Sequence, residues 1–362
     1  MHVAVEAVGN KSGGGQTVIN DVLSQLTAAD AVRKTSIFCS PDLNIPAHRS
    51  LNIYRMPTET HSYVARFLWH ELGLREKCRN LGVDIVVCMN SLGNVASIPQ
   101  VNYFQQGLIF CSDAKQRYGI LSRLKLGLIK RLTKRSCRNA DITVVQSQHI
   151  CEKITTEFQI PPAQVYVRKP CVSGPQWCGT PDPDKVRLIN ATEPQDRYLY
   201  VGSNKPHKNL SLLFEAFERL RTSSPKATLF LTCDANHALT TEGAIIQLGK
   251  VDKATLRELY SRSAVLVMPS LCETVGLPLL EAKLFGLQIV APNLPYAREF
   301  SDNSTLHFDP HDPDDFAQKM NRASDKTQGV DHPKPSRAAG SHLEPPNRQS
   351  WLIDIIENRL SS

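Results

Sequence analysis

Short apolar runs alternate with amphipathic segments along most of the chain. In the first half, strands are expected at 2–8, 36–39, 51–56, 84–90, 100–104, 141–147 and 165–169, and helices at 16–26, 62–80, 114–139 and 148–158. In the second half, strands are expected at 197–203, 227–233, 244–249, 264–270 and 288–292, and helices at 209–221, 253–262 and 277–286. Nearly continuous apolar strands separated by helices are typical of parallel sheets that helices cover on both faces. The pattern therefore predicts an α/β protein with two doubly wound, Rossmann-like domains that face each other across a cleft.

A loop rich in proline and glycine separates the two series of strands. We expect an N-terminal domain at 1–170, an interdomain linker at 171–196, a C-terminal domain at 197–323, a flexible polar linker at 324–350 and an amphipathic helix at 351–362. The helix places its apolar side chains on one face, which needs an apolar partner. These side chains are Trp351, Leu352, Ile355, Ile356 and Leu360.

Composition narrows the class of protein. The 362 residues are 41% apolar and 21% charged, which indicates a globular chain, and the net charge of +7 suits an anionic substrate, an anionic membrane surface or nucleic acid. The ten cysteines include no CxxC pair, so we expect no zinc site and a reducing compartment. The N-terminus lacks a signal-peptide layout and no apolar run approaches the ~20 residues of a membrane span, so we expect a cytoplasmic protein.

Two glutamates flank the turn between an expected strand and the next helix. Glu273 follows the strand at 264–270, and Glu281 lies in or just after the first turn of the helix that begins near Gly276. The free amides around Thr274, Val275, Gly276 and Leu277 favour an anion. A diphosphate on these amides, with a carboxylate for the hydroxyls on either side, matches a nucleotide sugar. Alternatively, Glu281 only complements the helix dipole and Glu273 is a solvated loop residue.

The stretch "MPSLCETVGLPLLEAKLFGLQIVAPNLPYARE" resembles the E-x7-E signature region of family 4 retaining glycosyltransferases, which have the GT-B fold. "YVGSNKPHKNLSLLFEAF" at 200–217 resembles the phosphate-binding motif of that family. "LGKVDKATLRELYSRSAVLVMPS" and "LHFDPHDPDDFAQKM" are similar to the segments before and after the signature. The resemblance implies an acceptor-side domain at 1–170 and a nucleotide-sugar-binding domain at 197–323.

The resemblance also implies roles for individual residues. Glu273 would contact the donor sugar near the reacting centre, and Glu281 would hold the ribose hydroxyls. Lys208 would bind the donor phosphates and stabilise the charge that develops on the leaving diphosphate; the alternative is an ordinary cation before a helix. Gly14 and Gly15 would let the backbone approach the phosphates, or would form only a strand-to-helix turn. The remaining implied donor-side residues are Ser203, Lys205, Thr274, Val275, Gly276, Leu277, Lys250 and Val251.

The sequence departs from the family pattern at two places. Ser203 stands where many members carry an arginine, and Lys205 either replaces that arginine or points to solvent. Gln105 and Gln106 stand on the acceptor side where a histidine is frequent. An amide can orient a hydroxyl but cannot act as a general base, which suits a front-face mechanism in which the leaving phosphate accepts the proton. His70 is interpreted as a helix-surface residue.

Residues 115–139 are basic and contain no acidic residue. Leu121, Leu124, Leu128, Ile129 and Leu132 give this expected helix an apolar stripe. One hypothesis is peripheral binding to the anionic inner face of a membrane, because basic amphipathic helices bind such surfaces. The alternative is a sheet-covering helix with a solvated basic face. Nucleic acid is not expected as a partner, because Tyr118 is the single aromatic residue in this stretch and no series of aromatic residues is interleaved for stacking.

The combined prediction is a retaining, hexosyltransferase-type glycosyltransferase. It would move a sugar from a nucleotide-sugar donor to a hydroxyl of a glycan or lipid-linked acceptor, in the synthesis of cell-surface polysaccharide or glycolipid. Neither a metal nor another cofactor is expected if Lys208 and the helix amides neutralise the diphosphate. Two alternatives remain open: a nucleotide-sugar epimerase or hydrolase on the same fold, and a non-catalytic nucleotide-sugar-binding protein.

Overall fold

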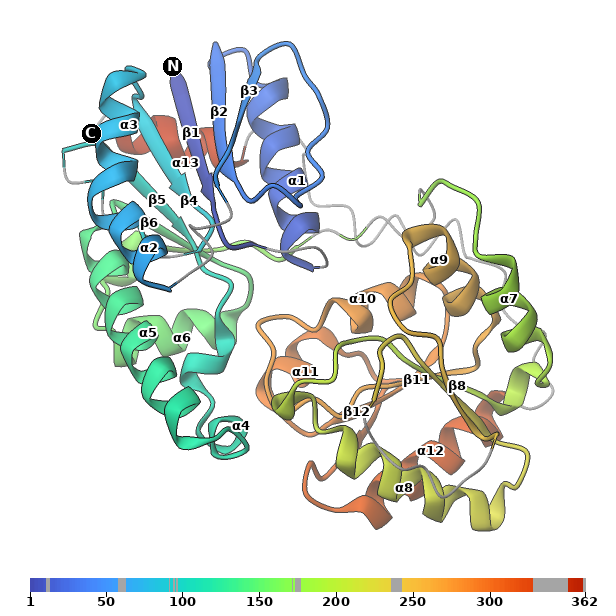
Figure 1. The fold of residues 1–362 in the computed structure, drawn as a ribbon. Helices are drawn as coiled ribbons and strands as arrows, with labels where there is room; N and C mark the ends of the chain where they lie inside the picture. Colours follow the sequence, from blue (N-terminus) through green and yellow to red (C-terminus); the bar gives the residue numbers. More distant parts are fainter. Residues whose placement is uncertain are drawn as a thin grey trace. The chain divides into compact units, whose positions relative to one another are not determined.

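Two compact units make up the computed structural model of the chain (Figure 1). The structure describes residues 1–10, 14–57, 63–90, 92–93, 95, 97–170, 172, 177–235, 243–327 and 351–360. The N-terminal unit takes the described residues of Met1–Phe110, Ile120–Pro170 and Glu344–Ser362. The C-terminal unit takes those of Cys111–Gly119 and Cys171–Leu343. The short segment Cys111–Gly119, which we call the arm, is therefore packed with the C-terminal unit.

The N-terminal unit is built on a seven-stranded parallel sheet of order β3-β2-β1-β4-β5-β6-β7. The strands are β1 (His2–Ala7), β2 (Lys34–Cys39), β3 (Leu51–Arg55), β4 (Ile85–Cys88), β5 (Gln100–Tyr103), β6 (Ile142–Val145) and β7 (Val165–Val167). The helices are α1 (Gly14–Ala28), α2 (Tyr63–Leu68), α3 (Leu74–Asn80), α5 (Ile120–Asn139), α6 (Gln148–Glu157) and α13 (Trp351–Leu360). Because successive residues of a strand face opposite sides, Val3 and Val5 pack with α1 and α13, whereas Ala4 packs with α3.

The C-terminal unit has a six-stranded parallel sheet of order β10-β9-β8-β11-β12-β13. The strands are β8 (Arg197–Tyr200), β9 (Thr228–Leu231), β10 (Ile245–Gln247), β11 (Val265–Val267), β12 (Gln288–Pro292) and β13 (Leu306–Phe308). The helices are α4 (Ser112–Gln116), α7 (Pro183–Asn190), α8 (Leu210–Ser223), α9 (Lys253–Arg262), α10 (Leu277–Leu284), α11 (Pro295–Phe300) and α12 (Pro313–Thr327). These two sheets confirm the predicted α/β fold class.

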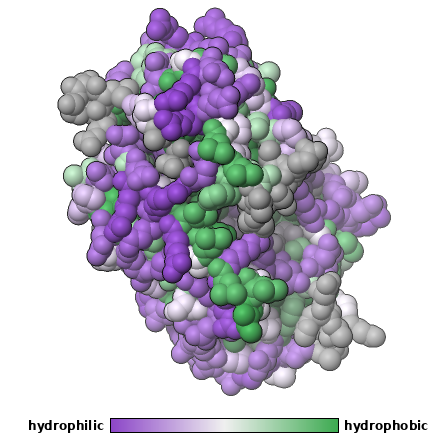
Figure 2. Space-filling model, turned by 60° about the vertical axis from the view of Figure 1, so that its left-hand side comes forward, coloured by the Kyte–Doolittle hydropathy of each residue, from purple (hydrophilic) through white to green (hydrophobic). Residues whose placement is uncertain are grey.

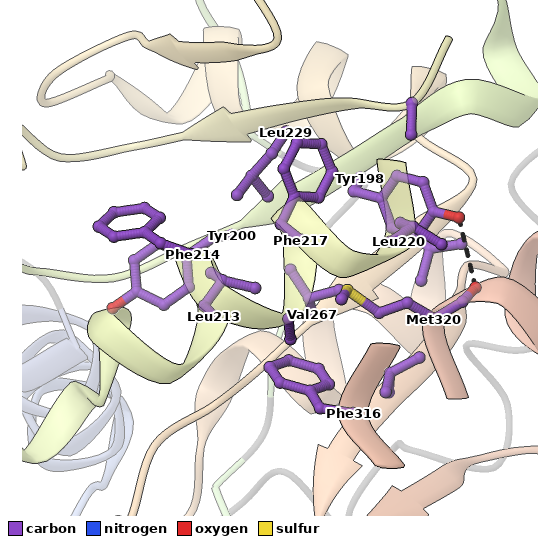
Figure 3. Packing of buried hydrophobic residues seen from close by; sticks show 14 of the residues in the cluster. Tyr198, Tyr200, Leu213, Phe214, Phe217, Leu220, Leu229, Val267, Phe316 and Met320 are labelled. Carbon is purple, nitrogen blue, oxygen red and sulfur yellow. Dashed lines mark hydrogen bonds between the residues drawn. The ribbon is translucent and has the colours of Figure 1, made fainter. Parts of the chain in front are cut away.

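Two apolar clusters cover the faces of the second sheet. On one face, Phe217 of α8 and Phe316 and Met320 of α12 pack against Tyr198 and other strand residues (Figure 3). The Tyr198 hydroxyl donates to the Met320 carbonyl oxygen at 3.3 Å. On the other face, residues of α9, α10 and α11 form a second cluster with inward-facing strand residues. The sheet is thus buried on both sides, which leaves its strand ends to carry polar chemistry.

Several helices differ from the expected pattern. The helix expected at 62–80 is divided into α2, a π-helical turn at Trp69–Gly73, and α3. The basic helix expected at 114–139 is also divided, because α4 ends at Gln116 and α5 begins at Ile120. Helix α7 lies within the expected linker 171–196, and α12 continues to Thr327, so that the linker expected at 324–350 begins inside a helix. The rest of that linker, 328–350, lies outside the described residues.

The C-terminal helix and one histidine also differ in detail from the expectation. In α13, Leu352, Ile353 and Ile356 are buried against the core of the N-terminal unit, so Ile353 joins the expected apolar face. The interpretation of His70 as a surface residue was wrong. Its side chain is 2% exposed, and its Nε2 lies 3.9 Å from Oε1 of the buried Glu6. His70 lies in the π-helical turn, in which the neighbouring Trp69 packs against Phe38 of β2.

Cysteine pairing departs from the expectation of reduced thiols. Cys111 of the arm and Cys272 form a disulfide with a Cα–Cα distance of 6.2 Å. The free cysteines that are buried pack as small apolar side chains. They are Cys39, Cys78, Cys88, Cys137 and Cys233. Within the described part of the chain, no helix is both long and apolar enough to span a bilayer.

Candidate active site

The turn between β11 and α10 forms the base of the candidate site. Gly276 caps the helix with φ of 77°, and a Cβ at this position would lie 2.8 Å from Cε of Met268. Glycine is therefore required both by the left-handed backbone and by the close approach. Within the described residues, the backbone amides from Thr274 to Leu277 donate no hydrogen bond. These amides and the helix dipole together create a favourable position for an anion.

Lys208 and Glu273 form an ion pair beside this turn. Each side chain is only 17% exposed, so the two charges attract each other more strongly than charges in open solvent. Asn209 ends the Lys208 turn with a left-handed backbone, φ of 55°, and opens α8. The Leu271 amide donates to the His207 carbonyl oxygen at 2.8 Å and joins the two loops. The fold therefore brings a cation and a carboxylate to one place from residues far apart in sequence.

Glu281 is held more deeply, within α10. Its side chain is 6% exposed, and Tyr260 of α9 donates its hydroxyl to Oε2 at 2.8 Å. Burial raises the pKa of Glu281, while the hydrogen bond from Tyr260 and the charge of Lys253 oppose that rise. The same burial raises the pKa of Tyr260 well above its ordinary value, so that its hydroxyl remains a donor. Glu281 thus has one oxygen occupied by Tyr260 and is suited to accept a further hydrogen bond from an alcohol.

The remaining donor-side residues surround these groups less closely. Ser203 accepts a hydrogen bond from the Tyr200 hydroxyl at 2.9 Å through its carbonyl oxygen. Lys205 is exposed at the start of the turn that carries Lys208. Val251 packs against the same apolar cluster as Tyr260, and the exposed Lys250 accepts a hydrogen bond from Lys185 through its carbonyl oxygen at 3.1 Å. These contacts involve backbone carbonyls and apolar packing, so they assign no donor-binding role to the side chains of Ser203, Lys205, Lys250 or Val251.

A second group of predicted residues lies in the N-terminal unit. Gly14 begins α1, and a Cβ on Gly15 would lie 3.7 Å from Oε1 of Gln105, an ordinary contact distance. The Gln105 amide donates to the Met89 carbonyl oxygen at 3.3 Å, and Gln106 donates to the Asn90 carbonyl oxygen at 3.1 Å. Gly14, Gly15 and the two glutamines thus follow the carboxyl ends of β1 and β5, the two strands that flank β4, as expected for a ligand-binding edge.

Sequence reasoning missed several partners of the predicted residues. His207 precedes Lys208 in the "PHKN" stretch, and that position was the one available signal for it. Burial, together with the neighbouring Lys208, lowers the pKa of His207 to about 4. Tyr260 and Tyr118 carried no signal, because their contacts with Glu281 and His207 depend on the tertiary structure.

Comparison with solved structures shows how widely this fold is shared. HepE of Anabaena, solved in complex with UDP and glucose, superposes with a TM-score of 0.71 at 14% identity, covering 99% of this chain and all of its own. WaaG, a glycosyltransferase involved in lipopolysaccharide biosynthesis, gives a TM-score of 0.72 at 16% identity over 94% of this chain and 98% of its own. At such low identity the likeness establishes the two-unit α/β fold.

Residues 195–326 match the family described as "Glycosyl transferases group 1". The matched segment contains the stretches whose sequence resembles the glycosyltransferase signature. The O-antigen chain mannosyltransferase RfbU of Salmonella typhimurium is 27% identical over 139 residues, which cover 36% of this chain and 38% of RfbU. The O-antigen chain mannosyltransferase B of Escherichia coli is 33% identical over 127 residues, 32% of this chain and 33% of its own length. The aligned region thus spans under two fifths of these relatives.

Proposed function

We propose that the protein is a retaining glycosyltransferase that moves a sugar from a nucleotide-diphosphate donor to a hydroxyl of a glycan or lipid-linked acceptor. The observation that carries this proposal is the ion pair between Lys208 and Glu273 at the start of α10. The group 1 domain match and the relatives named as mannosyltransferases support it. Because HepE was solved with UDP and glucose, a nucleotide sugar is the donor class to test first.

Each group at the site has a part in the proposed reaction. The donor diphosphate would lie on the free amides from Thr274 to Leu277, with Lys208 as its counter-charge. When the bond between the anomeric carbon and the phosphate oxygen breaks, negative charge grows on the leaving diphosphate, and Lys208 stabilises it. Glu273 would accept hydrogen bonds from the sugar hydroxyls, and Glu281 from the ribose hydroxyls. No step in this scheme requires a protein base, because the leaving phosphate accepts the proton of the incoming hydroxyl.

The proposal is tested with the full chain and a panel of uridine and guanosine diphosphates, followed by their sugar conjugates, with mannose conjugates first. Calorimetry measures binding, and transfer to a hydroxyl acceptor is measured by product mass. We expect Lys208→Ala to lower kcat about 10²- to 10³-fold, the range for loss of one preorganised electrostatic contact. Glu273→Ala should abolish transfer while the nucleotide diphosphate still binds.

A matched control is available within the same unit. Lys319 pairs with Asp315 on α12 at 3.1 Å, and both are partly buried like Lys208 and Glu273. Lys319→Ala should leave transfer unchanged, since that pair lies on α12 and not on the two loops that carry Lys208 and Glu273. Rapid turnover of the donor without an acceptor would instead indicate an epimerase or hydrolase. Nucleotide-sugar binding without any turnover would indicate a binding protein, and no nucleotide binding at all would refute the proposal.

We also propose that α5 places the enzyme on an anionic membrane surface that holds a lipid-linked acceptor. Its N-terminal half exposes Ile120, Leu121, Leu124 and Leu128 at 58% to 83%. On the side of the molecule where α5 lies, apolar atoms gather among hydrophilic ones (Figure 2). This combination of exposed leucines and cations is typical of helices that lie in a membrane interface.

The cations of α5 divide into two groups. Lys130 and Arg135 pair with Glu157 and Glu71, so they are engaged in holding the helix to its own unit. Arg123 and Arg131 instead line the exposed groove formed with Leu124 and Leu128. The membrane proposal therefore assigns lipid headgroup contacts to this second group.

Vesicle flotation separates the two interpretations of α5. Replacing Arg123 and Arg131 with glutamine should weaken binding to anionic vesicles by about 2 kcal/mol, a roughly 30-fold loss. Replacing Leu121 and Leu124 with serine should also release the protein, whereas the exposed Leu188 on α7 serves as a control for loss of an apolar surface residue. Equal recovery of the unchanged protein with neutral and anionic vesicles would refute membrane binding.

A further inference from the structure

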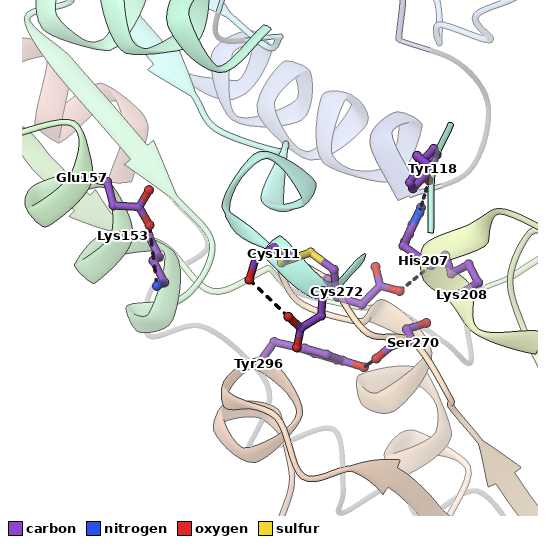
Figure 4. Close-up of a disulfide and its surroundings, with 12 residues drawn as sticks. Cys111, Tyr118, Lys153, Glu157, His207, Lys208, Ser270, Cys272 and Tyr296 are labelled. Carbon is purple, nitrogen blue, oxygen red and sulfur yellow. Dashed lines mark hydrogen bonds and ion pairs between the residues drawn. A yellow bond between two sulfur atoms is a disulfide. The ribbon is translucent and has the colours of Figure 1, made fainter. Parts of the chain in front are cut away.

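The arm, Cys111–Gly119, is fastened to both loops of the proposed donor site (Figure 4). At its start, Cys111 is joined by the disulfide to Cys272, the residue directly before Glu273. Near its end, the Tyr118 hydroxyl lies 2.6 Å from Nδ1 of His207, the residue directly before Lys208. Cys111 and Tyr118, which lie outside the signature motifs, thus contact Cys272 and His207. These two partners directly precede the charged residues Glu273 and Lys208.

The contact between Tyr118 and His207 has the geometry of a built interaction. Their rings are stacked, with centroids 6.2 Å apart and an interplanar angle of 17°. Because burial keeps His207 neutral near pH 7, its Nδ1 is able to accept a hydrogen bond from the Tyr118 hydroxyl. Burial also raises the pKa of Tyr118, so that hydroxyl keeps its proton. A neutral His207 adds no positive charge beside Lys208, which leaves Lys208 as the cation of that turn.

These contacts connect the arm and the two loops in a closed set of interactions. The arm holds Cys272, Glu273 pairs with Lys208, and the backbone of His207 accepts a hydrogen bond from Leu271 of the opposite loop. Cys272 is 3% exposed, so the disulfide anchors the arm in the packed body of the unit and not at a mobile surface point. Reduction of the disulfide removes the covalent link between the arm and the Glu273 loop. The hydrogen bonds and the ion pair that remain are individually weak.

We propose that the arm is a positioning element of the donor site and that its disulfide makes donor binding depend on the thiol redox state. This inference deepens the proposed function and rests on it for the identity of the ligand. A dithiol reductant opens the bond by thiol exchange: it gives two electrons and two protons, Cys111 and Cys272 become thiols, and the dithiol closes to its own disulfide. Tyr118 acts as a positioning residue, because it reaches the site through His207.

The first experiment tests the arm without any ligand. Digestion of the full chain with its free thiols alkylated should yield a peptide that links Cys111 and Cys272, and alkylation of both residues without prior reduction would overturn the proposal. Hydrogen exchange is then followed in peptides that cover 203–210 and 271–277. Treatment with dithiothreitol should speed exchange in both peptides, and unchanged exchange in both would overturn the proposal whatever nucleotide the protein binds.

The second experiment measures the consequence for the donor. Reduction should weaken binding of the nucleotide diphosphate, and Cys111→Ser should bind as weakly as the reduced protein and no longer respond to dithiothreitol. Cys178→Ser, which removes an exposed thiol that is not part of the disulfide, should respond like the unchanged protein. A response that persists in Cys111→Ser would overturn the proposal. Faster exchange on reduction in a protein that binds no nucleotide would instead refute the proposed function and leave the arm as a brace of these loops.

Tyr118 provides an independent variant that keeps the disulfide. Tyr118→Phe retains the ring and loses the hydroxyl, so KM for the donor should rise about twofold to tenfold, the range of one hydrogen bond, with kcat nearly unchanged. Tyr118→Ala, which also loses the stacked ring, should raise KM further. A fall in kcat with KM unchanged in both variants would contradict a positioning role.

Discussion

Replacing Tyr260 with phenylalanine isolates the hydrogen bond that holds Glu281. Tyr260 is fully buried, and its hydroxyl donates to the carboxylate at 2.8 Å, so the variant removes one polar contact and little volume. Hydrogen bonds to charged groups contribute roughly 1.5–3 kcal/mol. For a unit of this size, we expect the melting temperature to fall by about 3–12 °C. Tyr198→Phe is the matched control, because the buried Tyr198 donates at 3.3 Å to a neutral carbonyl.

The pH dependence makes this prediction specific to a carboxylate. The Tyr260 hydrogen bond favours the ionised form of Glu281, so the loss in Tyr260→Phe should be largest above the raised pKa of Glu281 and shrink as the pH falls through it. Tyr198→Phe should show the same loss at every pH. Calorimetric melting across the acid range measures the loss of stability in both variants. The reasoning would be refuted if Tyr260→Phe lost no more stability than Tyr198→Phe, or if its loss did not change with pH.

Three further predictions concern stability. Gly276→Ala should lower the free energy of unfolding by about 1–2 kcal/mol because of the left-handed backbone, and by a further amount because the new Cβ displaces a contacting methionine. Gly243→Ala has the same φ of 77° but open space around its Cβ, so in the same melting assay it should show only the backbone contribution. Ile356→Ala should destabilise the N-terminal unit by about 2–5 kcal/mol in urea unfolding, because Ile356 is fully buried in its core; an effect below 1 kcal/mol would contradict the docking of α13. As the pH falls from 6.5 towards 4, His207 takes up a proton in the unfolded chain before it does so in the folded chain. The free energy of unfolding of the unchanged protein should therefore fall by at most about 3 kcal/mol more over this range than that of His207→Gln.

Much of the fold was predictable because local patterns and tertiary packing agree. The apolar run that forms β1 is buried along its whole length, and the amphipathic run after Gly14 became α1 with its apolar face inward. The pattern was misleading where tertiary contacts override helical periodicity. The basic run continues through Arg117 and Tyr118, yet the helix breaks there, and Tyr118 contacts His207, which lies in the same C-terminal unit but 89 residues away in the sequence. Such a break is determined by a contact distant in sequence, which periodicity does not detect.

The candidate site was predictable to the extent that its chemistry lies in contiguous motifs. Glu273 and Lys208 were each identified within a short stretch with a recognisable pattern, and the structure joins them directly. The donor to Glu281 was not predictable, because Tyr260 lies in a helix whose sequence indicates only an amphipathic face. The cysteine pair was equally hidden, since Cys111 and Cys272 are 161 residues apart and connectivity does not follow from sequence.

The two carboxylates of the signature are therefore not equivalent, although they look alike in the sequence. Glu273 is only partly buried and its charge is balanced by Lys208, so it stays close to solvent and to any substrate that displaces this pairing. Glu281 lies within the apolar side of α10, where burial disfavours its charge and only the Tyr260 hydrogen bond and the charge of Lys253 favour it. A carboxylate in the first environment is adapted to exchange partners during a reaction, whereas one in the second is adapted to hold a fixed hydroxyl. The environment of each glutamate thus matches the division of labour proposed for them, with Glu273 at the sugar and Glu281 at the ribose.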